Sequence, residues 1–363
     1  MSDLAKTALF DEHLLLQGKM VPFAGFAMPV QYKNGALKEY TFVREGGAGL
    51  FDITHMGQAR VTGPDALAFL QYVSTNDVSK LEEGQVQYSA LLNDAGSFID
   101  DITSYKISDR EFYLCINAAN RHKDVAHLLT QAEAFDVVFT DESDDTTLLA
   151  LQGAAAQAAL QPLVDGDLES IAYYKFAQVK VCGVDGIISR TGYTGEDGFE
   201  IYIPNSSAIA TWKQLLANGA EAIGLAARDM LRTEMGYALY GHEISDAVTP
   251  VEAKLMWITK LDKGDFIGSE AVQARRISGA HKRLIALKLT ARGIPREHYK
   301  VFVDGVESGE VTSGMHSPMA GGVALAYVKP EHAELGELAV EIRGKLVAAE
   351  RTTLPFVRSN VRR

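Results

Sequence analysis

The pattern of apolar and polar positions along the chain predicts short strands mixed with helices. Apolar residues recur at helical spacing over 36–44 and 121–134, whereas short apolar or alternating runs at 86–92 and 98–106 predict strands. The turn sequence Asn93-Asp94-Ala95-Gly96 separates these two runs, which is typical of a hairpin. Hairpins interrupted by helices indicate an α+β fold, because regular βαβ winding would alternate strands and helices one by one.

The pattern changes from about Arg283 onward. Short apolar strands follow one another without intervening helices, and this spacing predicts a small all-β barrel or sandwich. The turns between these strands share a glycine and fall at Asp304-Gly305, Ser313-Gly314, Ala320-Gly321-Gly322 and Arg343-Gly344. We therefore expect one region over 1–278 and a C-terminal β-barrel domain over 279–363.

Composition excludes several classes of protein. The formal net charge of −12 argues against nucleic acid as a partner, because phosphate binding needs a local excess of Lys and Arg. Apolar runs are too short to cross a bilayer, and the first ten residues resemble neither a signal nor a transit peptide. Both cysteines, Cys115 and Cys182, lie in apolar strand-like surroundings and are expected to be buried thiols. A reducing, cytoplasmic location is expected.

The stretch from Ser189 to Tyr202 predicts a second hairpin, with a wide glycine-rich tip. Gly192, Gly195 and Gly198 recur every three residues, which is typical of a chain that turns tightly and approaches something closely. Side chains alternate along the strand that follows, so Glu200 faces opposite to its neighbours. A carboxylate fixed beside aromatic rings suits a flat, nitrogen-rich ligand. An ordinary hairpin with an exposed glutamate is the alternative.

A pair of neighbouring acids, Asp100 and Asp101, lies in the strand F-I-D-D-I-T-S-Y. Neighbouring side chains of a strand face opposite ways, so only one carboxylate can enter a given pocket. Burial raises the pKa of such a group and makes it a candidate acid or base, and Tyr88 lies across the hairpin from the pair. The alternative is a pair of solvated acids at the end of a strand.

Two arginines, Arg228 and Arg232, are four residues apart and therefore share one face of a predicted helix. They suit either an ion-paired helix surface or a guanidinium aimed at a ligand carboxylate. Asp229 is expected to pair poorly with either of them. The chain has no G-x-G-x-x-G after a strand, no Walker A sequence, no H-E-x-x-H and no G-x-S-x-G. We therefore expect no metal site, and a reactive group brought by the substrate or an exchanging cofactor.

A dozen segments in order resemble one family, the glycine cleavage T-protein family of aminomethyltransferases, over 50–318. They are L-F-D-I-T-H-M-G-Q from Leu50, T-N-D from Thr75, Q-Y-S from Gln87, I-D-D from Ile99, N-A-A-N from Asn117, I-A-Y-Y from Ile171, S-R-T-G-Y-T-G-E-D-G-F-E from Ser189, A-R-D-M-L-R from Ala227, L-Y-G-H-E from Leu239, T-P-V-E-A from Thr249, D-F-I-G from Asp265 and T-S-G-M-H-S-P from Thr312. Each segment is weak alone, but their common order is specific.

The resemblance implies a three-domain cloverleaf around a central folate channel, with 1–278 holding two interleaved α+β subdomains. It implies transfer of the one-carbon unit of an aminomethyl group from the lipoyl arm of H protein to tetrahydrofolate, a co-substrate. The products are 5,10-methylenetetrahydrofolate, ammonia and the reduced lipoyl arm. The family's key aspartate falls on Asp101. Its folate-contacting positions fall on Tyr88, Asn117, Tyr173, Tyr193, Glu200, Arg228 and Arg363, with Arg362 as the alternative to the last.

Two other functions remain open from the sequence. Another transferase on this scaffold could demethylate a small sulfonium or N-methyl compound with the same folate contacts, but the complete R-T-G-Y-T-G-E-D-G-F-E run favours glycine cleavage. A non-catalytic folate-binding factor for iron–sulfur assembly or RNA modification would carry a K-G-C-Y type motif. The aligned R-T-G-Y-T-G has no cysteine, which disfavours that class.

Overall fold

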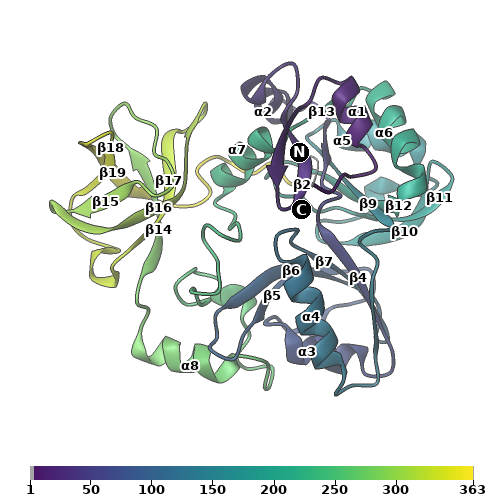
Figure 1. The fold of residues 1–363 in the computed structure, drawn as a ribbon, viewed down its shortest axis with the longest axis horizontal. Helices are drawn as coiled ribbons and strands as arrows, with labels where there is room; N and C mark the ends of the chain where they lie inside the picture. The colour runs from purple at the N-terminus through teal and green to yellow at the C-terminus, as the bar shows by residue number, and fades with distance from the viewer. Residues whose placement is uncertain (1–3, 363) are drawn as a thin grey trace.

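Three β-sheet lobes meet around one helix in the computed structural model, which describes residues 4–362 (Figure 1). The helix is α7 (Leu225–Met235), which packs on α2 (Ala36–Arg44), on β2 (Phe26–Gln31) and on strand β16 (Val306–Ser317) of the barrel. β2 forms a two-stranded antiparallel ribbon with β1 (Lys19–Phe23). This arrangement confirms the α+β class with a C-terminal barrel.

The first lobe is a five-stranded antiparallel sheet with the order β5-β6-β7-β4-β8. Helices α3 (Ala66–Val73) and α4 (Arg121–Ala132) pack against it and enclose its hydrophobic core. In chain order its strands are β4 (Gly57–Thr62), β5 (Val86–Leu92), β6 (Phe98–Ser108), β7 (Glu111–Ile116) and β8 (Val138–Asp141).

The second lobe is a six-stranded sheet with the order β10-β11-β12-β9-β3-β13, antiparallel except for the β3–β13 pair. Helices α5 (Ala156–Leu160) and α6 (Ala208–Ala217) contribute to its core, as do Leu9 and Leu16, which flank α1 (Phe10–Leu15). Its strands are β3 (Gly49–Asp52), β9 (Thr146–Gln152), β10 (Phe176–Val181), β11 (Val184–Ser189), β12 (Gly198–Pro204) and β13 (Glu221–Ala222). β3 and β4 are close in sequence but belong to different sheets, so the chain passes back and forth between these lobes.

The registers of two hairpins position the acids singled out in the sequence. In the β5–β6 hairpin, Ala90 lies opposite Asp101 and Tyr88 lies opposite Thr103. In the β11–β12 hairpin, Ser189 lies opposite Glu200. Phe199, next to Glu200, is fully buried in the core of the six-stranded lobe, while Glu200 remains half-buried on the other face. Both predicted hairpins and the alternation along β12 are confirmed.

The third lobe is a closed six-stranded barrel with the order β14-β17-β16-β15-β18-β19. The predicted turns at Asp304-Gly305 and Arg343-Gly344 join neighbouring strands. The predicted turn at Ser313-Gly314 is wrong, because both residues lie inside β16, where the register shifts after Val311. The strands are β14 (Arg283–Leu289), β15 (Lys300–Val303), β16 (Val306–Ser317), β17 (Gly321–Val328), β18 (Leu338–Ile342) and β19 (Lys345–Thr352).

The glycine at 314 serves close packing. A Cβ there would lie 2.9 Å from the carbonyl oxygen of Pro295. Glycine inside a strand often marks a bulge or a close approach of another backbone segment, which the local sequence does not distinguish from a turn.

A long connection leads from α7 to the barrel and crosses the five-stranded lobe. The amide of Phe98 donates to the carbonyl of Val248 at 3.0 Å, and the Lys263 ammonium donates to the carbonyls of Gln71 and Asn76 at 2.6 and 2.9 Å. The connection ends in α8 (Ser269–Ser278), a few residues before β14. The domain boundary between 278 and 279 stays a prediction.

Two expectations from composition concern membrane-spanning helices and the burial of the cysteines. No helix within residues 4–362 combines the length and apolarity required to span a membrane. Both cysteines are free thiols, and Cys115 is buried in the sheet as expected. Cys182 is only half-buried, so the prediction of a buried thiol is wrong there, because it lies in the tight turn between β10 and β11.

A pair of glycines tests the packing of the six-stranded lobe. Gly153 has φ of +119° and a Cβ added there would lie 1.9 Å from the carbonyl oxygen of Gly47, whereas Gly183 has φ of +83° and open space around it. We expect Gly183→Ala to cost about 1 kcal/mol, from backbone strain alone. Gly153→Ala should cost about 3 kcal/mol or more, because strain and collision add. Urea unfolding measures both, and equal losses would contradict this account.

Candidate active site

Asp101 sits on β6 and is held by two donors from neighbouring strands. The Tyr88 hydroxyl donates to Asp101 Oδ2 at 2.8 Å from β5. The side-chain amide of Asn117, just after β7, donates to Asp101 Oδ1 at 2.6 Å. Asp101, Tyr88 and Asn117 are all half-buried, as expected for side chains that border a cavity. The structure therefore brings together three of the residues singled out in the sequence.

The neighbouring Asp100 points into the protein and has no exposed surface. It accepts hydrogen bonds from the Asn117 amide nitrogen at 2.8 Å and from Asn120 Nδ2 at 2.6 Å. Asn117 Nδ2 also reaches Asp100 Oδ1 at 3.0 Å, so one amide group touches both carboxylates. As expected, the two acids face opposite ways, because Asp100 is fully buried and Asp101 only half-buried. The side chain of Asn117 nevertheless contacts both carboxylates.

The surroundings of Asp101 raise its pKa to about 7. Burial is the main cause and the negative charge of Asp100 is the second, while the hydrogen bonds from Tyr88 and Asn117 act in the opposite direction. A carboxyl group with a pKa close to neutral can exchange a proton under physiological conditions. Asp101 is thereby suited to general acid–base chemistry.

Glu200 forms the second half of the site. It lines a small pocket of about 10 Å³, together with Arg228, Tyr193 and Gln152. Burial raises the pKa of Glu200, and the hydrogen bond from Thr191 and the charge of Arg228 oppose that rise. The Arg228 guanidinium lies 4.5 Å from the centre of the Tyr193 ring. A carboxylate and a guanidinium therefore share one partly desolvated pocket.

Arg232, one turn after Arg228, forms ion pairs with acidic side chains of the protein. It pairs with Asp229 at 2.8 Å and with Glu243 at 3.1 Å, and it donates to the Ser313 hydroxyl at 2.8 Å. The prediction that Asp229 pairs poorly is wrong, because the two side chains meet at the i, i+3 spacing of a helix. Arg228 is the member of the pair that lines the pocket.

Tyrosines connect the two acids electrostatically. Burial is the main cause of the raised pKa of Tyr193. The positive charges of Arg232 and Arg228 oppose the rise, and the negative charge of Asp101 adds to it. Burial also dominates the raised pKa of Tyr174, to which Glu200 and Asp101 both contribute. Two tyrosines within the range of both halves indicate that Asp101 and Glu200 converge on one region.

The remaining residues predicted from the sequence are Tyr173 and a C-terminal arginine. Tyr173 is half-buried, and its ring packs edge-on against Tyr174 at 4.9 Å. Arg363 lies outside the described residues. Arg362, the alternative at that end, forms an ion pair with Glu169, and both side chains are about half exposed. The side chain of Arg362 is thus paired outside the pocket that contains Glu200.

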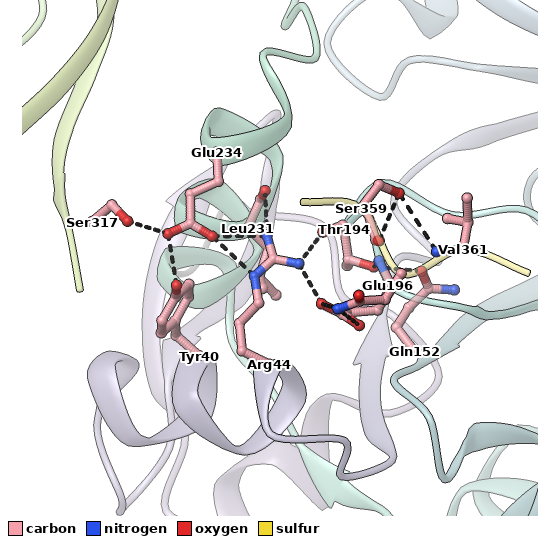
Figure 2. A network of polar contacts seen from close by, with 12 residues as sticks. Tyr40, Arg44, Gln152, Thr194, Glu196, Leu231, Glu234, Ser317, Ser359 and Val361 are labelled. Carbon is pink, nitrogen blue, oxygen red and sulfur yellow. Dashed lines mark hydrogen bonds and ion pairs between the residues drawn. The ribbon is translucent and has the colours of Figure 1, made fainter. Parts of the chain in front are cut away.

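A buried network behind the site was not found from the sequence (Figure 2). The Glu234 carboxylate on α7 accepts hydrogen bonds from Tyr40 at 2.6 Å, from Arg44 at 2.9 Å and from the Ser317 hydroxyl of the barrel. Arg44 also pairs with Glu196 at 2.7 Å, next to the glycine-rich tip. No local motif predicts these contacts, because Arg44 and Glu234 are 190 residues apart in the chain.

A larger groove lies away from these residues. It has a volume of about 960 Å³ and is lined by both acids and bases, among them Arg60, Glu142, Lys180 and Asp185. Neither Asp101 nor Glu200 borders it. Within 4–362, moreover, no three His, Cys, Asp or Glu side chains are grouped so that they could hold a metal ion.

Comparison with known proteins supplies the family. The GCVT N-terminal domain matches residues 9–263, and the glycine cleavage T-protein C-terminal barrel domain matches residues 282–358. The chain belongs to the glycine cleavage T-protein family. The resemblance inferred from the ordered motifs is therefore confirmed.

Full-length relatives agree with this assignment. An aminomethyltransferase of Desulfitobacterium hafniense is 45% identical over 96% of this chain and 97% of its own length. One from Thermus thermophilus is 44% identical over 98% and 99% of the two chains. The crystal structure of glycine cleavage system aminomethyltransferase T from Bartonella henselae superposes with a TM-score of 0.93, at 35% identity and over 99% of this chain.

In this T-protein family member, the raised pKa of Asp101 makes stability depend on pH. The folded state retains the proton up to about pH 7, whereas an unfolded aspartate releases it near 3.8. The folded state therefore binds more protons in that window, and the free energy of unfolding falls as pH rises through it. We expect Asp101→Asn to remove this fall and to stabilise the protein by about 2 kcal/mol at pH 8 but little at pH 4.

Urea unfolding at both pH values measures this effect. Exposed Asp262 supplies the matched control, because Asp262→Asn removes the same charge at the surface. Equal effects of the two substitutions at pH 8 would contradict the raised pKa of Asp101.

Proposed function

We propose that the chain transfers the one-carbon unit of an aminomethyl group from the lipoyl arm of H protein to tetrahydrofolate. The products are 5,10-methylenetetrahydrofolate, ammonia and dihydrolipoyl H protein. The observation that carries this proposal is a carboxyl group with a near-neutral pKa, Asp101, close to a half-buried pocket that contains Glu200 and Arg228. Family membership over almost the whole chain supports the same activity.

The reaction needs a group that can receive and return protons. Two folate nitrogens form bonds to the transferred carbon, while its bonds to the ammonia nitrogen and to the lipoyl sulfur break. The two N–H protons of folate are then distributed to ammonia and to the lipoyl thiol. A base with a pKa near neutral can accept such a proton during attack and pass it on, and we assign this role to Asp101.

Hydrogen-bond donors around Asp101 fix the orientation of its carboxyl group. Tyr88 and Asn117 occupy one site on each carboxyl oxygen, at 2.8 and 2.6 Å. Since a carboxylate oxygen has two acceptor sites, each retains one for a substrate N–H group. In its ionised form Asp101 also stabilises the positive charge that develops on the attacking nitrogen.

Glu200 and Arg228 suit the recognition of the folate. The pyrimidine edge of a pterin presents adjacent N–H donors that a carboxylate can accept in parallel. The charge of Arg228 favours the ionised form of Glu200. The faces of Tyr173 and Tyr193 are suited to flat rings, and Arg363 would serve the anionic tail of the coenzyme.

The partners in this proposal are folate and the lipoylated H protein, and the compartment is the cytoplasm. The relatives described above carry the name aminomethyltransferase, which favours transfer from a lipoylated carrier over demethylation of a small sulfonium or N-methyl compound. It also favours an enzyme over a non-catalytic folate-binding factor.

Reconstitution tests the reaction directly. We expect ammonia release when the protein is mixed with aminomethylated H protein and tetrahydrofolate, and none when either is omitted. A parallel assay with small sulfonium and N-methyl donors tests demethylation. Methylated or methylenated folate formed only with the small donors would overturn the proposal.

Two substitutions separate chemistry from binding. Asp101→Asn should lower kcat at least about 100-fold, because it removes the base, while folate binding changes little. Glu200→Gln should weaken folate binding about tenfold or more, because one acceptor of a parallel pair becomes a donor. Stopped-flow turnover and folate titration calorimetry measure the two effects. Exposed Glu270→Gln, on α8, is the control.

The contrary outcomes are specific. Near wild-type turnover of Asp101→Asn would remove Asp101 from the chemistry. Unchanged folate affinity of Glu200→Gln would remove Glu200 from the binding site.

A further inference from the structure

A third aspartate, Asp124, lies behind the pair on β6. It belongs to the first turns of α4, and no part of it is exposed to solvent. Within residues 4–362, neither of its carboxyl oxygens has a hydrogen-bond donor. An ionised carboxylate in such a place would cost several kcal/mol, because its hydration is lost and nothing replaces it. The geometry therefore requires Asp124 to be neutral.

A neutral carboxyl group has one O–H donor, and Asp100 provides its acceptor. Burial raises the pKa of Asp100, and contact with Asp124 is the strongest influence that opposes this rise, while the same contact contributes to raising the pKa of Asp124. Burial is the largest cause of the pKa of about 11 for Asp124, and the charge of Asp100 is the second. Both influences favour the protonated form.

Asp100 then receives enough donors to remain an anion inside the protein. The backbone and side-chain amides of Asn117 donate at 2.8 and 3.0 Å, and Asn120 Nδ2 donates at 2.6 Å. The O–H group of Asp124 supplies a fourth donor, and a carboxylate has about four acceptor sites. Without that fourth donor, Asp100 would be a buried anion with one site unsatisfied.

The charge on Asp100 in turn acts on Asp101. It opposes ionisation of Asp101, second only to burial. Other titratable groups around this row of acids come from several elements. They include Tyr88 on β5, Cys115 on β7, Tyr174 before β10, Tyr193 in the glycine-rich tip and Lys123 beside Asp124 on α4. The Lys123 ammonium donates to the Tyr240 hydroxyl at 2.9 Å.

We propose that Asp124 is a positioning residue for the transfer reaction, a neutral acid whose proton keeps Asp100 ionised and so sets the proton affinity of Asp101. This inference rests on the proposed function only for the role of Asp101. The protonation of Asp124 and its bond to Asp100 are properties of the folded chain and can be measured without turnover.

Two substitutions of Asp124 have different consequences. Asn keeps an N–H donor toward Asp100 and carries no charge, so it reproduces the neutral acid. Leu has a similar size and no donor, so Asp100 takes up a proton and its charge is lost. The acid limb of the pH profile of kcat reports the pKa of Asp101. In Asp124→Leu the midpoint of this limb should then fall by about one pH unit. In Asp124→Asn the limb should keep its wild-type midpoint.

The kinetic experiment compares these pH profiles in the reconstituted transfer reaction. A shift in Leu alone supports the proposal. Equal downward shifts in Asn and Leu would overturn it, because they would show that Asp124 is ionised in the wild-type protein. Unchanged midpoints in both variants would also overturn it.

A spectroscopic experiment avoids dependence on turnover and on the folding of the Leu variant. The full-length protein is labelled with carboxyl-¹³C aspartate and its NMR spectrum is recorded at pH 9. We expect one aspartate signal that is still protonated there and that disappears in Asp124→Asn. Absence of such a signal in the wild type would overturn the inference. If that signal is present but no transfer occurs, the proposed function is refuted and the inference about Asp124 stands.

Discussion

The carboxylate of Glu234 is the contact that joins α2 and α7 to the barrel. It accepts hydrogen bonds from Tyr40 and Arg44 on α2 and from Ser317 at the end of β16, while its backbone carbonyl accepts from Phe356 at 2.7 Å (Figure 2). A buried ion pair adds little net stability compared with apolar packing, but loss of one partner is costly. The network therefore acts mainly as a geometric constraint, which keeps α7 and its arginines in one position relative to α2, the glycine-rich tip and the barrel.

Buried acids in this protein are accommodated in two ways. Glu234 and Glu196 are both paired with the guanidinium of Arg44, which is nearly inaccessible to solvent. Asp100 and Asp101 instead rely on amides, a phenol and a neighbouring carboxyl group. A cation would hold a carboxylate ionised, whereas neutral donors leave its proton affinity adjustable. The first arrangement suits a joint between lobes, and the second suits a group that must change its protonation state.

Local parts of the fold could be predicted from the sequence, because both hairpins depend on turn residues and alternation close in the chain. The meeting of Tyr88 with Asp101 follows from the register of one such hairpin. Contacts between distant segments could not be predicted without the resemblance, since nothing near Arg44 in the sequence indicates Glu234. Asp124 was missed because a helical aspartate is usually solvated, and its burial depends on how α4 packs. Ser313-Gly314 was misread because close packing and turns use the same residue.

The segment that follows the barrel lies on the glycine-rich tip of the β11–β12 hairpin. Ser359 and Asn360 donate to the carbonyl of Gly195 at 3.0 and 2.8 Å, across 164 residues of chain for the first of these bonds. Ribosomes add about 5–20 residues per second, so the tip emerges roughly ten to thirty seconds before this partner. The glycine-rich tip is therefore made before the segment that supports it, and it gains these two hydrogen bonds only after the barrel has been synthesised.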